Sequence, residues 1–209
     1  MMSGIYFSIE LAIANIYGEV SMSDEMVIRC CAPTLAALKT GSLFNCAFES
    51  RREMTESLKA INRCLLQKGV TALPLRYQSG RALVYLCRMD MLEVDLQNPQ
   101  AEAILRKCGY PDGTTIRKIA CLIRRLREYE TFPHEIGLFL GYPPADVRGF
   151  MEGKACKCTG LWKVFESDEA EAQRYFARCR HCTSVFLQRC REGWSLSRLT
   201  IQPRQFSYI

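Results

Sequence analysis

The sequence predicts an α+β fold, in which a small and mostly antiparallel sheet is packed with helices. Short apolar runs alternate with amphipathic stretches of helical period along the chain. Two of these runs flank Gln78-Ser79-Gly80, a polar turn that is typical of a β-hairpin. The expected order is strand, helix, strand, strand and one later strand, and all four strands should join one sheet: Leu43–Phe48, Val70–Tyr77, Arg81–Arg88 and Leu161–Phe165.

Caps and periodic apolar residues predict the helices. Ser50 and Glu53 form a capping box for a helix that runs to Lys68, with Met54, Leu58, Ile61 and Leu65 on its buried face. Ser23 caps an earlier helix. Three further helices are expected at Asp90–Leu96, at Pro99–Cys108 and at Thr115–Tyr129, and a long one runs from Ser167 to about Glu192. In the third, Ile116, Ile119, Ile123 and Leu126 should face inward, with Arg117, Lys118, Arg124 and Arg125 on another face.

The length of 209 residues suits one domain with a substantial core. Residues 22–200 are expected to form it, followed by a tail at 201–209. Residues 1–21 are expected to be an N-terminal extension or a helix docked on the core, and Met22 could also begin the chain. The apolar run 4–17 is interrupted by Glu10, lacks basic residues before it and is too short to cross a bilayer. We therefore expect a cytoplasmic protein without a membrane segment.

Residues 132–153 predict two short helices joined by a turn at Gly141, which is a helix-turn-helix-like corner. Thr131 is the expected cap of the first helix, and the second helix should turn Val147, Phe150 and Met151 inward. DNA-reading helices present outward Arg, Lys, Asn, Gln, Ser or Thr near their N-terminus. The outward residues here are instead Ala145, Asp146, Arg148, Gly149 and Glu152. A structural corner is therefore favoured, and nucleic-acid binding through Arg148 and Lys154 is an alternative that the net charge of +6 permits without requiring.

Twelve cysteines are the unusual feature of the composition. Disulfide-stapled secreted proteins are usually shorter, and Cys64 and Cys87 lie inside apolar patterns. These two are expected to be small buried residues of a reducing cytosol.

Four cysteines form a candidate metal or redox site, which would hold zinc or an iron–sulfur centre: Cys156, Cys158, Cys179 and Cys182. The neighbouring lysines at 154, 157 and 163 are expected to lower the pKa of the first two thiols. A competing interpretation places the second pair in the core, because both belong to one helical stripe: Tyr175, Phe176, Cys179, Cys182, Phe186 and Cys190.

A small-molecule or anion pocket is a third hypothesis, with Lys39, Thr40 and Ser42 as its binding residues. Phosphate cradles normally lie between a strand and a following helix, whereas this segment leads from a helix into a strand. No Ser-x-x-Lys accompanies Lys39-Thr40-Gly41, so a β-lactamase-like enzyme is not supported. His134 and Glu135 are helix neighbours whose side chains point apart, so no catalytic residue is assigned. An enzyme of unknown reaction stays an alternative.

Four segments of the sequence carry a family resemblance: CAPTLAALKTGSLFNC, RALVYLCR, FPHEIGLFLGYPPADVRGFMEGK and CKCTGLWKVF. Together they resemble a family of short bacterial proteins catalogued as the domain of unknown function number 3793, from about Met22 to about Thr200. This family has no assigned activity, so the resemblance implies no catalytic residue. The sequence therefore favours a cytosolic binding or regulatory module, with thiol or metal handling as its specific function.

Overall fold

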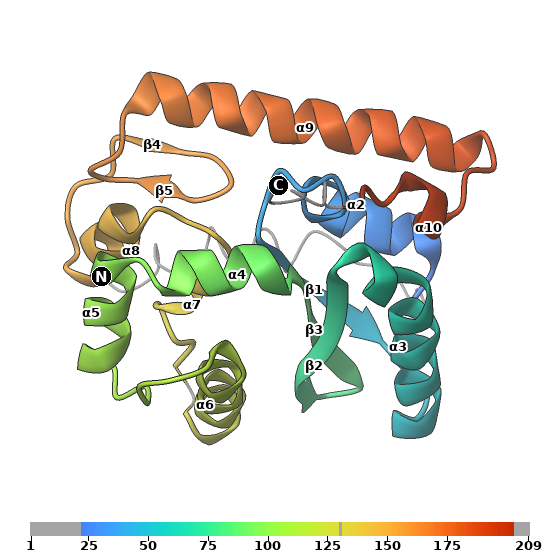
Figure 1. Ribbon diagram of the computed structural model, residues 1–209, viewed down its shortest axis with the longest axis horizontal. Coiled ribbons are helices and arrows are strands. Elements are labelled where there is room, and N and C mark those ends of the chain that lie inside the picture. Colours follow the sequence, from blue (N-terminus) through green and yellow to red (C-terminus); the bar gives the residue numbers. More distant parts are fainter. Residues whose placement is uncertain (1–21, 130, 203–209) are drawn as a thin grey trace, which may run out of the picture.

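The computed structural model describes residues 22–129 and 131–202 (Figure 1). Its main sheet contains β1 (Gly41–Ala47), β2 (Val70–Gln78) and β3 (Arg81–Arg88) in the order β1-β3-β2, and both pairings are antiparallel. The turn between β2 and β3 has positive φ at Ser79 and Gly80, as a tight two-residue hairpin requires. Three of the four predicted strands are therefore confirmed, as is the predicted hairpin.

Helices cover both faces of this sheet, because the central strand β3 is apolar on both sides. Ala82, Val84 and Leu86 belong to one core cluster, and the alternating Leu83, Tyr85 and Cys87 belong to another. The first cluster is closed by α2 (Asp24–Leu35) and α3 (Arg51–Leu65), and the short 3-10 turn η1 (Leu66–Lys68) leads from α3 to β2. The second is closed by α4 (Met89–Leu96), α5 (Pro99–Lys107), α6 (Thr115–Glu128), α7 (Ile136–Phe139) and α8 (Pro144–Met151).

The fourth predicted strand does not join the main sheet. Within Leu161–Phe165 only β5 (Lys163–Val164) is extended, and it pairs with β4 (Cys158–Thr159) in a separate ribbon. The backbone N–H groups of Phe165 and Glu166, which follow β5, donate to the Asp146 side chain on α8 at 2.8 and 2.7 Å. This ribbon is therefore anchored to α8, and the prediction of a single sheet is wrong.

The long helix α9 (Glu169–Arg191) crosses the molecule above α2 and the ribbon (Figure 1). Its cap is Asp168, one residue beyond the predicted Ser167, and the Asp168 carboxylate accepts from Glu171 N at 2.7 Å. The predicted apolar stripe faces the body, since Phe176, Cys179 and Cys182 are buried. A short helix that the sequence analysis missed, α10 (Leu196–Leu199), then returns the chain to α2 and α3.

Several residue-level predictions for the helices are wrong. Ile116 is 70% exposed and Met151 is 39% exposed, although both were expected inside. Lys118, expected on a solvated basic face, is buried because its ammonium donates to Leu96 O at 3.1 Å. Cys64 is exposed, although it was expected to be buried. The predicted inward face of α3 is confirmed: Met54, Leu58, Ile61 and Leu65.

The predictions for residues 1–21, and for the tail 201–209 from residue 203 on, concern segments outside the described part of the chain. Within the described ranges, no helix combines the length and the apolar character needed to cross a membrane.

Candidate binding cleft at Lys39

The segment that follows α2 turns the side chain of Lys39 into the protein. Ala37 has a φ of 55°, and the N–H groups of Leu38 and Lys39 both donate to Pro33 O, at 2.8 and 3.1 Å. This compact turn leaves Lys39 only 7% exposed. Its ammonium donates to Gly41 O at 2.5 Å and lies 5.1 Å from the centre of the Tyr142 ring.

Two glycines bring this segment against the turn between α7 and α8. A Cβ at Gly41 would lie 2.7 Å from Phe139 O, and one at Gly141 would lie 2.6 Å from Thr40 Oγ1. Gly141 also has a φ of +74°, which glycine adopts without strain. The Thr40 hydroxyl donates to Asp95 on α4. The two segments of the family resemblance that contain these glycines thus meet around Thr40.

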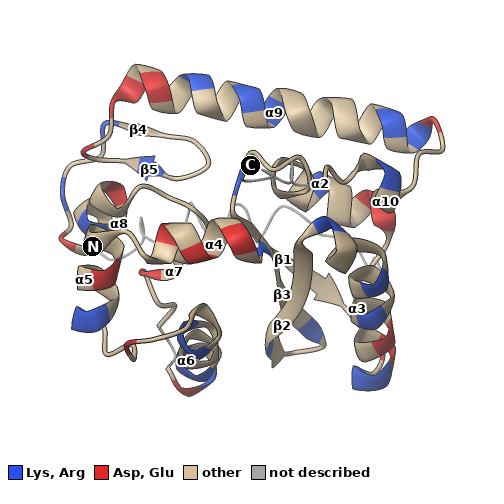
Figure 2. Cartoon of the chain, viewed as in Figure 1, with Lys and Arg blue, Asp and Glu red and all other residues tan. Residues whose placement is uncertain are grey.

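A cleft of about 400 Å³ opens beside this contact. Lys39, Thr40 and Asp95 line its inner part, and the exposed Asp168 and Glu171 lie at its rim, at the start of α9. Figure 2 shows acidic residues on α4 and at this end of α9. The remaining lining is largely apolar or aromatic: Leu38, Met91, Gly141, Pro143, Trp162, Ser167, Ala172 and Tyr175.

Ser42 does not line this cleft. Its hydroxyl instead lies 2.9 Å from the Thr34 hydroxyl under α2. Of the three residues predicted for a pocket, Lys39 and Thr40 reach the cleft and Ser42 supports the strand beside it. Asp95, Trp162 and Tyr175 were missed, because only the tertiary fold brings them to Lys39.

Burial sets the electrostatics of the cleft. It lowers the pKa of Lys39 to about 8, although nearby Cys31 and Cys179 oppose this shift. No ion pair joins Lys39 to a carboxylate in the described part of the chain, even though the cleft contains three acidic residues. Burial also raises the pKa of Asp95, against the effect of the hydrogen bond from Thr40. The cleft therefore has at its inner end an ammonium group that loses its proton more readily than an ordinary lysine, and it has carboxylates toward solvent.

The four candidate metal ligands do not gather into one site. Cys156 is exposed on the loop before β4, whereas Cys179 and Cys182 are buried along α9. Among residues 22–129 and 131–202, no three His, Cys, Asp or Glu side chains are grouped so that they could hold a metal ion. The second cysteine pair belongs to the apolar stripe of α9, which was the competing interpretation.

The expected activation of the thiols by lysines is also absent at Cys158. Burial raises the pKa of this thiol, and it raises the pKa of Cys179 and Cys182 as well. The neighbouring Lys154 pairs with Glu166 at 2.5 Å, and Lys157 donates to Glu166 O and Ser167 O. The ammonium groups of Lys154 and Lys157 therefore bind carboxylate and carbonyl oxygens.

The helix-turn-helix-like corner is covered on the face that would read bases. Asp146 and Gly149, predicted outward, are buried, and a Cβ at Gly149 would lie 2.6 Å from Phe165 Cβ. Arg148 and Lys154 both bind the Glu166 carboxylate, which lowers the pKa of Glu166. The first helix is only Ile136–Phe139 and is not capped by Thr131. This arrangement favours the structural interpretation of the corner.

His134 and Glu135 have separate partners. The imidazole of His134 packs edge-on against Phe150 at 4.9 Å between ring centres. The buried carboxylate of Glu135 accepts from Arg125 Nε at 2.9 Å and from the Tyr110 hydroxyl at 3.0 Å. They do not form an acid–base pair.

The structure thus defines an α+β domain with a three-stranded antiparallel sheet between two helical layers and a cleft where α4, the ribbon and α9 meet. The chain belongs to the family described as "Protein of unknown function (DUF3793)", whose model matches residues 27–200. No curated protein and no solved structure matches the chain.

Proposed function

We propose that the protein is a binding module for a small polar molecule that enters the cleft and contacts the amine of Lys39. The observation that carries this proposal is the burial of the Lys39 ammonium with no carboxylate partner among the residues that the structure describes. An unpaired buried cation lowers stability, so its presence in a cleft indicates a role other than holding the fold together.

The charges of the cleft indicate the class of ligand. The inner amine suits a carboxylate or carbonyl oxygen, whereas Asp168 and Glu171 at the rim suit an ammonium group or hydroxyls. The aromatic residues Trp162 and Tyr175 offer apolar contact between these two ends. A volume of about 400 Å³ is in the range of small-molecule sites. A compact molecule with an acidic or carbonyl end and an amine end, such as an amino acid, meets these conditions.

A second candidate function is catalysis by the Lys39 amine, which its pKa of about 8 favours. A neutral lysine amine adds to a carbonyl carbon and, with loss of water, forms an imine. Borohydride reduces such an imine to a stable secondary amine. Trapping of a carbonyl compound on Lys39, located by peptide mass spectrometry, would favour an enzyme over a passive binding module.

The twelve cysteines, all free, support a reducing and therefore cytoplasmic location for this binding module.

The proposal is tested by amide NMR of the full chain during titration with free amino acids, short amines and 2-keto acids. We expect at least one compound to shift the signals of Thr40, Gly141 and Ala172, and we expect Lys39→Met to abolish the shifts. Lys118→Met is the matched control, because Lys118 is also buried but lies outside the cleft. Absence of localised shifts with all three classes, or equal shifts in Lys39→Met, would contradict the proposal.

A further inference from the structure

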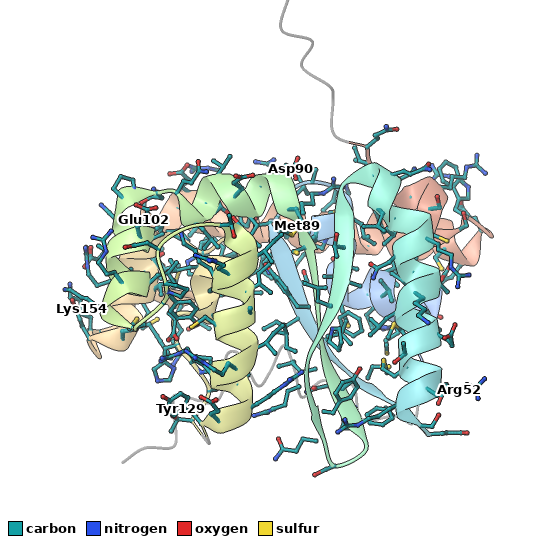
Figure 3. The ribbon with its side chains drawn as sticks, turned by 60° about the horizontal axis from the view of Figure 1, so that its bottom comes forward. Arg52, Met89, Asp90, Glu102, Tyr129 and Lys154 are labelled. Atoms are coloured by element: carbon teal, nitrogen blue, oxygen red, sulfur yellow. The ribbon has the colours of Figure 1, made fainter. Side chains whose placement is uncertain are left out.

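A second cleft, of about 840 Å³, lies beside the edge strand β2, between the start of α3 and the C-terminal end of α6. Figure 3 shows this region, with Tyr129 at the end of α6 and Arg52 on the outer side of α3. The lining contains three arginines, Arg51, Arg76 and Arg127, together with Tyr77, Gln78, Leu126, Glu128 and Tyr129.

The three arginines have no acidic partners among residues 22–129 and 131–202. None of their guanidinium groups forms an ion pair or a hydrogen bond with a described residue. Arg125, which lies on α6 beside the cleft, is by contrast paired with Glu135 at 2.9 Å. Glu128 is the one carboxylate among the described lining residues, and it lies 4.0 Å from Arg124, which is outside the cleft. The cleft therefore concentrates positive charge and leaves guanidinium donors available to an anion.

Aromatic rings lie beside these cations. The guanidinium of Arg51 lies 5.0 Å from the centre of the Tyr77 ring. Tyr129, at the other side of the cleft, is 54% exposed, and the Arg125 guanidinium lies 5.3 Å from the centre of its ring. Planar exposed rings and arginines are the groups on which nucleobases stack.

From this combination we infer that the cleft binds a nucleotide, either free or as part of a single-stranded nucleic acid. The arginines contact the phosphates, and Tyr129 stacks on a base. This site is separate from the cleft at Lys39 and uses none of its residues. It also differs from the helix-turn-helix-like corner, where Glu166 neutralises the two cations.

Fluorescence anisotropy of the full chain with two probes tests the inference: a labelled oligothymidine of about twelve nucleotides and a fluorescent N-methylanthraniloyl derivative of ATP. Titrations are made at about 50 mM and about 200 mM sodium chloride, because phosphate contacts weaken with salt. We expect at least one probe to bind. Binding of the ATP derivative alone indicates a free nucleotide as ligand, and binding of the oligothymidine indicates a strand.

Arg76→Gln and Arg127→Gln should each weaken binding about tenfold and reduce its salt dependence. Arg52→Gln is the matched control, because Arg52 neighbours Arg51 on α3 but is outside the cleft lining, and it should leave the affinity unchanged. If Arg76→Gln fails to fold, Arg127→Gln decides, since Arg127 is exposed on α6. Failure of both probes to bind, or equal weakening by Arg52→Gln, would overturn the inference.

Discussion

Three buried cations, Arg88, Lys118 and Lys39, differ in the number of partners that their side chains have. The Arg88 guanidinium donates to the carbonyls of Thr34, Leu35, Lys68 and Ile201, at 2.6 to 3.1 Å. It thereby joins the end of α2 to η1 and to the chain after α10. Lys118 has the Leu96 carbonyl and Glu102 at 3.7 Å. Among the described residues, Lys39 contacts only Gly41 O and the Tyr142 ring. Lys39 is therefore the cation whose burial contributes least to the fold.

Replacement of Lys39 and of Lys118 by Met should consequently have opposite effects on stability. At neutral pH, Lys39→Met should raise the free energy of unfolding by about 1–3 kcal/mol, because the removal of a buried charge without a carboxylate partner outweighs the loss of its hydrogen bond to Gly41 O. Lys118→Met should lower it by about 1–2 kcal/mol, because it leaves a buried carbonyl without its donor. Urea denaturation of both variants makes this comparison, and destabilisation by Lys39→Met would show that this lysine supports the fold.

The pH dependence of the stability difference between Lys39→Met and the wild type gives an independent check. The pKa of Lys39 falls from 10.5 to about 8 on folding, so between these values the unfolded chain holds a proton that the folded protein has lost. The contribution of Lys39 to stability should therefore rise with pH across this interval, by at most about 3 kcal/mol. The advantage of Lys39→Met over the wild type should shrink accordingly as the pH increases toward 10.5.

Asp146 is the buried carboxylate that organises the ribbon. It accepts from the backbone N–H groups of Phe165, Glu166 and Ser167 and from Trp162 Nε1, at 2.7 to 3.0 Å. Burial opposes its ionisation, but the hydrogen bonds from Ser167, Phe165 and Glu166 prevail and lower its pKa.

Asp146→Asn should lower the free energy of unfolding at neutral pH by about 2–4 kcal/mol, because an amide nitrogen replaces one accepting oxygen. The stability that Asp146 supplies is present above its usual pKa of 3.8 and is lost as the pH falls through its lower folded value. Glu152→Gln, at an exposed ion pair at the C-cap of α8, is the control and should change stability by less than about 0.5 kcal/mol. Equal effects of the two substitutions would refute the role given to Asp146.

At the scale of elements, the ribbon β4–β5 packs closely against α9 because Gly160 has no side chain. A Cβ at Gly160 would lie 2.0 Å from Cδ2 of Phe176, which is fully buried. Phe176 also packs edge-on against Trp162, at 4.6 Å between ring centres. The ribbon and α9 therefore share a small core that forms one wall of the cleft at Lys39.

Gly160→Ala should push the ribbon away from Phe176 on α9 and lower the free energy of unfolding by about 1–3 kcal/mol. Gly153→Ala serves as the comparison, because a Cβ at Gly153 would meet no other atom. Its positive φ alone should make the substitution unfavourable, by about 1 kcal/mol. Trp162 should report the difference by fluorescence. A Gly160→Ala protein with unchanged stability and emission would contradict the proposed docking.

At the scale of the whole molecule, sequence patterns correctly predicted the features that depend on interactions between residues close in the chain. The hairpin at Ser79-Gly80 and the buried face of α3 follow from turn chemistry and helical period, and both are confirmed. The partner of Leu161–Phe165 depends on Asp146, which a helical period placed on the outer face of α8. Burial of an acidic residue by distant backbone donors leaves no periodic signal in the sequence.

The candidate site was predictable only in part for the same reason. Lys39 and Thr40 stood out as a polar pair between a helix and a strand, and they line the cleft. Asp95, Trp162 and Tyr175 lie far away in the sequence, and the fold alone brings them together. The cysteine hypothesis rested on spacing, but the helical stripe of α9 places its second pair inside the core.

The central claim is that a small molecule reaches the buried amine of Lys39 through the cleft. Acetylation of the folded protein by acetic anhydride over a range of pH, followed by peptide mass spectrometry, measures this access for every lysine. We expect Lys39 to be acetylated with half-maximal reactivity near pH 8, while Lys118, which is buried outside the clefts, stays protected. A Lys39 that remains unmodified while exposed Lys59 reacts would show that the amine is sealed in the core, and it would contradict the account.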